Sequence, residues 1–188
     1  QWPEMLEYYP KAIYRGGVYY KEMKGRGVKM IFVTVGSQKF SFDRLLTKVD
    51  QMAGEHMLTE EVYMQTGNST FEPKNCHYQQ FYDRDKFAEM VEKCSILITH
   101  GGVGIVVDAV KRGKKVIVVP RRAELGEHVD GHQQQLMEQF HARNLISACM
   151  NVDDLPYLLR MANTRKFGGY QSNTEQFVAS VDEFLQSL

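Results

Sequence analysis

Residues 95–120, SILITHGGVGIVVDAVKRGKKVIVVP, decide the fold of this chain. Two short runs rich in β-branched residues, 95–99 and 115–119, enclose a glycine turn and an apolar stretch that ends at Gly113. Short apolar runs bounded by turn residues are typical of strands buried on both faces, and the stretch between them has the length of a helix. The segment therefore predicts a strand, a helix and a second strand parallel to the first.

Strand and helix signals alternate in the same way along most of the chain. The predicted strands are residues 30–35, 61–66, 95–99 and 115–119, with a weaker candidate at 77–82. The predicted helices are residues 42–56, 85–94, 132–143 and 155–161, together with the stretch from 105 to 112. This order predicts an α/β fold with a doubly wound, Rossmann-like parallel sheet. In such a sheet, ligands bind beyond the carboxyl ends of the strands.

Composition excludes several classes of function. The chain has 188 residues, which suits one domain or one domain with an appendage. Its 23 basic and 23 acidic residues cancel, so we expect no nucleic-acid partner. No apolar run approaches the ~20 residues that span a bilayer. The three cysteines, Cys76, Cys94 and Cys149, form no metal-ligand spacing and suit buried thiols in a reducing cytoplasm.

Two glycine-rich turns follow strong strands: Gly36-Ser37, and residues 100–104 (HGGVG). A glycine turn that opens a helix leaves backbone N–H groups at the positive end of the dipole, which suits a diphosphate. Glycine is needed there because a Cβ would block the close approach of the ligand. One such turn is explained equally well by tight chain geometry, but two of them favour a nucleotide site. Neither is a Walker loop or a complete GxGxxG.

Asp108 lies one helical turn beyond Gly104, on the side that faces the predicted phosphate site. A carboxylate there can accept two hydrogen bonds from a ribose diol. Its neighbours at 105–107 and 109–110 are apolar, so Asp108 is predicted to be the polar residue of a buried turn, which requires a partner or a role. A solvent-exposed aspartate is the alternative.

The loop at residues 120–135 follows another strand and should reach the same edge of the sheet. Its acidic, basic and amide groups suit the hydroxyls of a sugar, although a solvated connection would have a similar composition. His128 and His132 are spaced as metal ligands can be, but no third ligand is evident and we expect no metal. The sequence Asp83-Arg84-Asp85 looks like the DxD signature of metal-dependent transferases. We interpret it as a helix N-cap.

Three motifs in this order, MIFVTVGS, ITHGGVGIVVDAVKRGKKVIVVPR and GEHVDGHQQQL, resemble the catalytic subunit of two-component bacterial exopolysaccharide and capsule glycosyltransferases. These enzymes contain the glycosyltransferase family 28 C-terminal domain. They are related to the catalytic subunit of the eukaryotic dolichol-linked N-acetylglucosaminyltransferase. The resemblance spans about residues 30–146, and its third motif favours the bacterial branch. It implies the donor-binding, C-terminal half of a GT-B enzyme.

The resemblance also implies a reaction: inverting, metal-independent transfer of a hexose from a UDP-sugar to a lipid-linked glycan acceptor. Asp108 would bind ribose, and Tyr82 with its neighbours would contact uracil, mainly through the backbone. The donor-binding residues that it implies are Gly36, Ser37, Tyr82, His100, Gly101, Gly102, Gly104, Asp108, His132, Gln133 and Gln134. The UDP-sugar is a substrate, so no cofactor is expected. No general base is identified, and the fallback candidates are Glu127, His128 and Asp130.

Residues 1–20 resemble the carboxyl end of the membrane-anchoring partner subunit of the same family. The resemblance predicts a fusion, with residues 21–29 as a linker and 30–188 as the donor domain. The start at Gln1 also suggests a fragment, and an ordinary N-terminal extension is the alternative. In this family the partner's tail docks on the last helix, here the amphipathic residues 173–188. The implied location is cytoplasmic, at the inner face of the plasma membrane through the partner.

Other functions remain open from the residues alone. A sugar-nucleotide epimerase of related architecture would need a second domain, for which 188 residues leave no room. A non-catalytic UDP-sugar-binding or regulatory subunit would keep the two glycine turns without needing the polar loop. A pure interaction module would explain the two terminal segments, but it leaves Asp108 and the loop unexplained.

Overall fold

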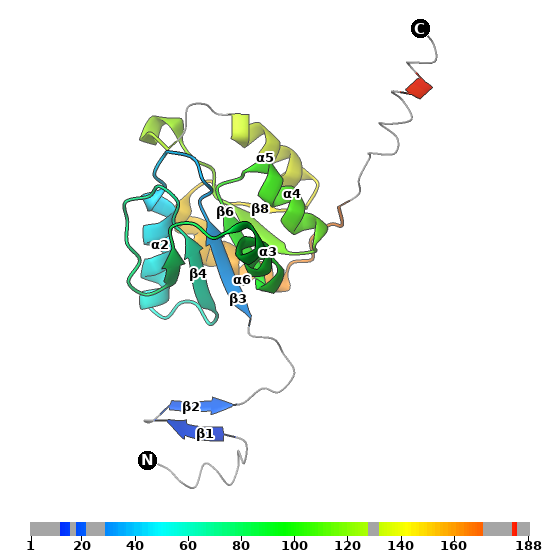
Figure 1. Ribbon diagram of the computed structural model, residues 1–188. Coiled ribbons are helices and arrows are strands. Elements are labelled where there is room, and N and C mark those ends of the chain that lie inside the picture. Colours follow the sequence, from blue (N-terminus) through cyan, green and yellow to red (C-terminus); the bar gives the residue numbers. More distant parts are fainter. Residues whose placement is uncertain (1–11, 16–17, 22–28, 128–131, 171–181, 184–188) are drawn as a thin grey trace.

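The computed structural model describes residues 12–15, 18–21, 29–127, 132–170 and 182–183 (Figure 1). Strands β1 (Ala12–Arg15) and β2 (Val18–Lys21) pair antiparallel in a two-stranded sheet of their own. Most of the predicted partner-like tail and linker, and nearly all of the predicted helix at 173–188, lie outside the described residues. The three-part division of the chain therefore stays a prediction.

The main sheet has six parallel strands in the order β5-β4-β3-β6-β7-β8. Their bounds are β3 (Met30–Thr34), β4 (Glu61–Gln65), β5 (His77–Gln79), β6 (Ile96–Thr99), β7 (Lys115–Val118) and β8 (Ser147–Ala148). Counted from β3, this is the strand order of a doubly wound dinucleotide-binding fold, and the strand order reverses between β3 and β6. The predicted fold class is confirmed.

Helices cover both faces of this sheet (Figure 1). On one face, α2 (Asp43–Gly54) and α6 (Leu155–Thr164) share a core with the side chains of Val33, Met64 and Ile98. On the other face, α3 (Arg84–Lys93), α4 (Val103–Lys111) and α5 (His132–Ala142) share a second core with Phe32 and Leu97. The apolar strands are buried because each of their faces meets a helical layer.

Most predicted elements agree with the structure to within a few residues, and the differences have local causes. The helix predicted at 155–161 extends to Thr164, because residues 162–164 contain no Gly or Pro. The sequence did not indicate β8, which has 2 residues, nor the short 3-10 turns η1 (Ala123–Leu125) and η2 (Val152–Asp154). Such short segments have no periodicity to detect. No helix in the described part of the chain is long and apolar enough to cross a membrane.

Two smaller predictions are also confirmed. Asp83 is the N-cap of α3, and its carboxylate accepts a hydrogen bond from the backbone N–H of Lys86 at 2.8 Å. The thiols of Cys94 and Cys149 are free and buried, whereas Cys76 is half-buried. Burial raises the pKa of Cys94 to about 11 and that of Cys149 to about 12, so both thiols are protonated at neutral pH.

Candidate functional site

Two predicted turns meet where the strand order reverses. Strands β3 and β6 are neighbours, and their last residues, Thr34 and Thr99, are partners in the register. The Gly36 turn leaves β3, and the turn at residues 100–102 leaves β6, at the same edge of the sheet. In a doubly wound sheet, this reversal opens the crevice in which ligands bind. The structure therefore brings together two segments that lie more than sixty residues apart in the sequence, as the turns predicted.

The buried imidazole of His100 lies between these turns. A Cβ added to Gly36 would lie 2.6 Å from His100 Cε1, and one added to Gly102 would lie 2.9 Å from His100 Nε2. Gly36 also has a φ of +77°, which L side chains rarely adopt. Packing therefore explains why glycine stands at positions 36 and 102, in addition to ligand approach, because a side chain at either position would collide with His100.

Gly104 differs from these two glycines. A Cβ placed there would meet no atom within 4 Å, and the residue is exposed in the first turn of α4. The N-cap of α4 is Gly102, which provides no capping side chain, and Val103 is 44% exposed. The first backbone N–H groups of a helix have no intrahelical acceptor, so they attract an anion that can reach them. The start of α4 is therefore exposed at Val103 and Gly104 and has no side-chain cap.

Asp108 lies one turn further along α4 and differs from the expectation. Its side chain is 47% exposed rather than buried, and it already has a partner. Arg112 Nε lies 3.1 and 3.0 Å from the two carboxylate oxygens, and Arg112 Nη1 donates to Glu92 at 2.9 Å. The apolar neighbours suggested burial, but they line the other sides of the helix, as Val106 and Ala109 do. The ribose role of Asp108 stays a prediction.

Tyr82 follows β5 in an irregular segment and is fixed at two points. Its ring packs edge-on against Phe32, with the centroids 5.8 Å apart, and burial raises the pKa of its hydroxyl. Its backbone N–H donates to Gln65 Oε1 at 3.1 Å. Ser37, in the turn after β3, is exposed. Both residues lie beyond the carboxyl ends of their strands, where the donor site was predicted.

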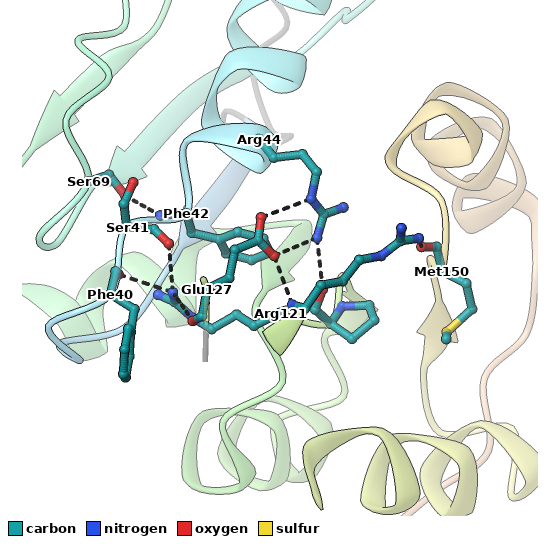
Figure 2. Close-up of polar contacts among 10 residues, drawn as sticks. Phe40, Ser41, Phe42, Arg44, Ser69, Arg121, Glu127 and Met150 are labelled. Atoms are coloured by element: carbon teal, nitrogen blue, oxygen red, sulfur yellow. Dashed lines mark hydrogen bonds and ion pairs between the residues drawn. The ribbon is translucent and has the colours of Figure 1, made fainter. Parts of the chain in front are cut away.

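The polar loop after β7 turns inward at Arg121, which is 3% exposed (Figure 2). Arg121 Nη1 donates to the carbonyl oxygens of Phe40, Ser41 and Glu127, and Nη2 donates to that of Val35 at 2.7 Å. Its guanidinium stacks on the Phe42 ring, and its Nε is buried with no partner among the described residues. Burial lowers the pKa of Arg121, while the charge of Glu127 opposes that shift. Arg121 thus anchors the segment that leaves β3.

The side chain of Glu127 is also held by hydrogen bonds within the protein (Figure 2). Its carboxylate accepts hydrogen bonds from Arg44 Nε and Nη2 and from the backbone N–H of Arg122. Arg44 also donates to the Pro120 carbonyl at 3.0 Å, so helix α2 is joined to the end of β7. The prediction of Glu127 as a general base does not fit this geometry, because both carboxylate oxygens are already bonded and the side chain is buried. Arg121, in the loop predicted to suit a sugar, likewise donates its guanidinium hydrogen bonds to carbonyl oxygens of the protein.

The remaining predicted site residues lie wholly or partly outside the described part of the chain. His128 and Asp130 lie outside the described residues. His132, Gln133 and Gln134 begin helix α5, but their side chains are outside the described part of the chain. Among the residues that the structure describes, no three His, Cys, Asp or Glu side chains gather as metal ligands would.

The sequence reasoning missed Thr34 and Gln65, two buried polar residues at the ends of β3 and β4. It also missed Arg44, because only the structure shows that this residue forms an ion pair with Glu127. A detectable signal existed for the first two, because a polar residue that ends an otherwise apolar strand must find a hydrogen-bond partner.

Comparison with known proteins agrees with this arrangement. Residues 30–187 match the glycosyltransferase family 28 C-terminal domain. The human UDP-N-acetylglucosamine transferase subunit ALG13 is 26% identical over 131 residues, which cover 65% of this chain. The chain spans 11% of the length of that protein and of its mouse counterpart.

Solved structures show the same fold. The crystal structure of the glycotransferase of kitacinnamycin superposes with a TM-score of 0.56 at 15% identity, over 80% of this chain and 38% of that one. An NMR structure of ALG13 superposes with a TM-score of 0.52 at 17% identity, over 77% of this chain and 90% of that one. At these identities the likeness concerns the fold of the domain.

Proposed function

Because this chain belongs to the glycosyltransferase family 28 C-terminal domain family over residues 30–187, we propose that it binds a UDP-sugar and takes part in transferring the hexose. The observation that carries the proposal is the site where the strand order reverses. The uncapped start of α4 lies there beside the Gly36 turn, with Asp108 one helical turn beyond Gly104. Amides for a diphosphate and a carboxylate for the attached ribose are thus provided by one helix.

The proposed reaction is inverting and needs no metal ion. As the bond between the sugar and the diphosphate breaks, negative charge accumulates on the β-phosphate. Backbone N–H groups in residues 101–104 would stabilise this charge, because the dipole of α4 points its positive end toward them. The acceptor hydroxyl attacks from the opposite face of the sugar, and its proton goes to a general base that we place on a partner subunit.

We further propose the finer context that the sequence resemblance implied. The acceptor would be a lipid-linked glycan in exopolysaccharide or capsule synthesis, held at the inner face of the plasma membrane by a membrane-anchored partner subunit. The partner would dock on residues 173–188, and residues 1–20 would correspond to its tail. The relative named ALG13 is called a transferase subunit, which supports a partnership of this kind.

A non-catalytic donor-binding subunit is the second candidate function. It is favoured by the engagement of Glu127, the one proposed base that the structure describes, with Arg44 and Arg122. The two functions predict the same donor binding. They differ in whether product forms once the partner and the acceptor are supplied.

Titration of the full chain with UDP-hexoses, with magnesium and with EDTA, tests the proposal. We expect binding in both conditions, and Asp108→Ala should weaken it about 30-fold, the value of a lost charged hydrogen bond. The matched control is Glu92→Ala, which removes the other partner of Arg112 and should change affinity less than twofold. Equal affinity for adenine nucleotides, or no nucleotide binding, would contradict the proposal.

A further inference from the structure

Three buried polar residues end three neighbouring strands of the sheet. They are Gln65 on β4, Thr34 on β3 and Thr99 on β6, and Thr34 is the register partner of both of the others. They therefore form a row across the edge at which the donor is proposed to bind. A polar side chain buried at this depth needs a hydrogen-bond partner, because its desolvation is otherwise unfavourable.

Gln65 finds its partners on both sides. Its Oε1 accepts the backbone N–H of Tyr82 at 3.1 Å, and its Nε2 donates to Thr34 Oγ1 at 3.3 Å. Thr34 Oγ1 also accepts the backbone N–H of Gly36 at 3.3 Å. A continuous hydrogen-bonded path therefore runs from the backbone of Tyr82, through two buried side chains, to the first glycine turn.

The backbone of Tyr82 depends on this path. Residues 80–83 lie between β5 and α3 and belong to no regular element. The carbonyl oxygen of Gln80 accepts a hydrogen bond from the Gly67 N–H and that of Asp83 accepts one from the Phe87 N–H, both at 2.8 Å, so the segment is held at its two ends. The ring of Tyr82 is held by Phe32, but an aromatic contact leaves the peptide free to rotate. The hydrogen bond to the Gln65 amide supplies the missing constraint on that peptide.

We infer that Gln65 is a positioning residue for base recognition, which rests on the proposed binding of a UDP-sugar. Gln65 does not touch the nucleotide in this scheme. It holds the peptide of Tyr82, to which the sequence resemblance assigns the uracil contact, and it joins this peptide through Thr34 to the Gly36 turn. Loss of Gln65 would therefore reduce the preference for uracil, and loss of Thr34 would leave that preference intact.

The test compares Gln65→Met with Thr34→Val in the full chain. Met preserves the size of the side chain and removes both hydrogen bonds, whereas Val at position 34 removes only the hydroxyl. The readout is the ratio of the dissociation constants for ADP and UDP, measured by calorimetry. We expect this ratio to fall about tenfold in Gln65→Met and to change less than twofold in Thr34→Val. Gln51→Met, on the exposed face of α2, is the matched control and should behave as the unmodified chain.

The outcomes of this test distinguish failure of the positioning role from failure of the proposed function. If the unmodified chain shows no preference for UDP, the proposed function fails. If that preference exists and Gln65→Met retains it, or weakens UDP and ADP equally, the positioning role is overturned. If a variant does not fold, the inference can still be tested on the unmodified chain. Hydrogen exchange in the unliganded chain should show a protected Tyr82 amide, and rapid exchange of that amide would overturn the inference.

Discussion

The Glu127 carboxylate accepts hydrogen bonds from both Nε and Nη2 of Arg44, at 3.0 and 2.9 Å, although the two residues are 83 positions apart. This pair joins helix α2 to the loop after β7 (Figure 2). The carboxylate of Glu127, a fallback candidate for the general base, thus connects two segments that are distant in the sequence.

Glu127→Ala should lower the free energy of unfolding by about 2–3 kcal/mol, because it leaves Arg44 and the Arg122 N–H without their shared acceptor. Urea denaturation measures this loss, and the exposed Glu124→Ala is the matched control. UDP-sugar affinity measured below the unfolding transition should change little. If Glu127→Ala keeps full stability and loses only sugar transfer, Glu127 is a catalytic base after all.

Substitutions at Gly104 and Gly36 should show which glycine is needed for ligand binding and which is needed for stability. Gly104→Ala should leave stability unchanged or raise it by up to about 1 kcal/mol, because the methyl group meets nothing and Ala favours helix. The same methyl group would lie against a bound diphosphate, so UDP affinity should fall at least tenfold. Gly36→Ala should instead lower stability by about 2 kcal/mol, through its positive φ and its contact with His100. Thermal unfolding and calorimetry on both variants test this contrast, and a Gly104→Ala chain that binds UDP normally would contradict it.

Arg112→Met should release Asp108 from its ion pair. Both side chains are partly exposed, so solvent screens their ion pair and the free energy of unfolding should change little. Affinity for UDP should stay the same or increase, because the carboxylate no longer shares its lone pairs with Arg112. Calorimetry checks this expectation. A loss of affinity as large as that in Asp108→Ala would instead assign Arg112 itself to the donor site.

The carboxylate of Asp43, in the first turn of α2, should make stability depend on acid pH. Burial raises its pKa, but hydrogen bonds from Thr70, Phe71 and Ser41 outweigh burial and lower the pKa below the ordinary 3.8. The stabilisation is present above that ordinary value and is lost as the pH falls through the lowered one. Asp43→Asn should therefore flatten the decline of stability as the pH falls below the ordinary 3.8. Urea denaturation at a series of acidic pH values measures it, and the exposed Asp85→Asn is the matched control.

The fold could be predicted because its signals are local. Residues 30–34 and 96–99 are apolar in every position but their last, so they had to become strands with both faces covered. The same reasoning failed for β8, whose 2 residues are strand only because Val118 and its neighbours pair with them. Asp83 was predicted correctly because a capping side chain acts within three residues of itself.

The candidate site was predictable in part for the same reason. Glycines after strands mark turns, and the sequence placed two turns at one edge of the sheet. It could not show that His100 fills the space between them, because this contact joins Gly36 and Gly102 across two strands. It also assigned Asp108 to a buried surface, since helical spacing gives the sides of a helix but not which of them meets the sheet.

What the sequence determined by itself is the kind of each element and the type of residue at each strand end, because periodicity, capping and turn chemistry act between near neighbours. The strand order, the inward direction of Arg121 and Glu127, and the path from Tyr82 through Gln65 to Gly36 were decided only by the tertiary structure. These features depend on which distant segments become adjacent. Burial then requires every polar group at the junction to find a partner there.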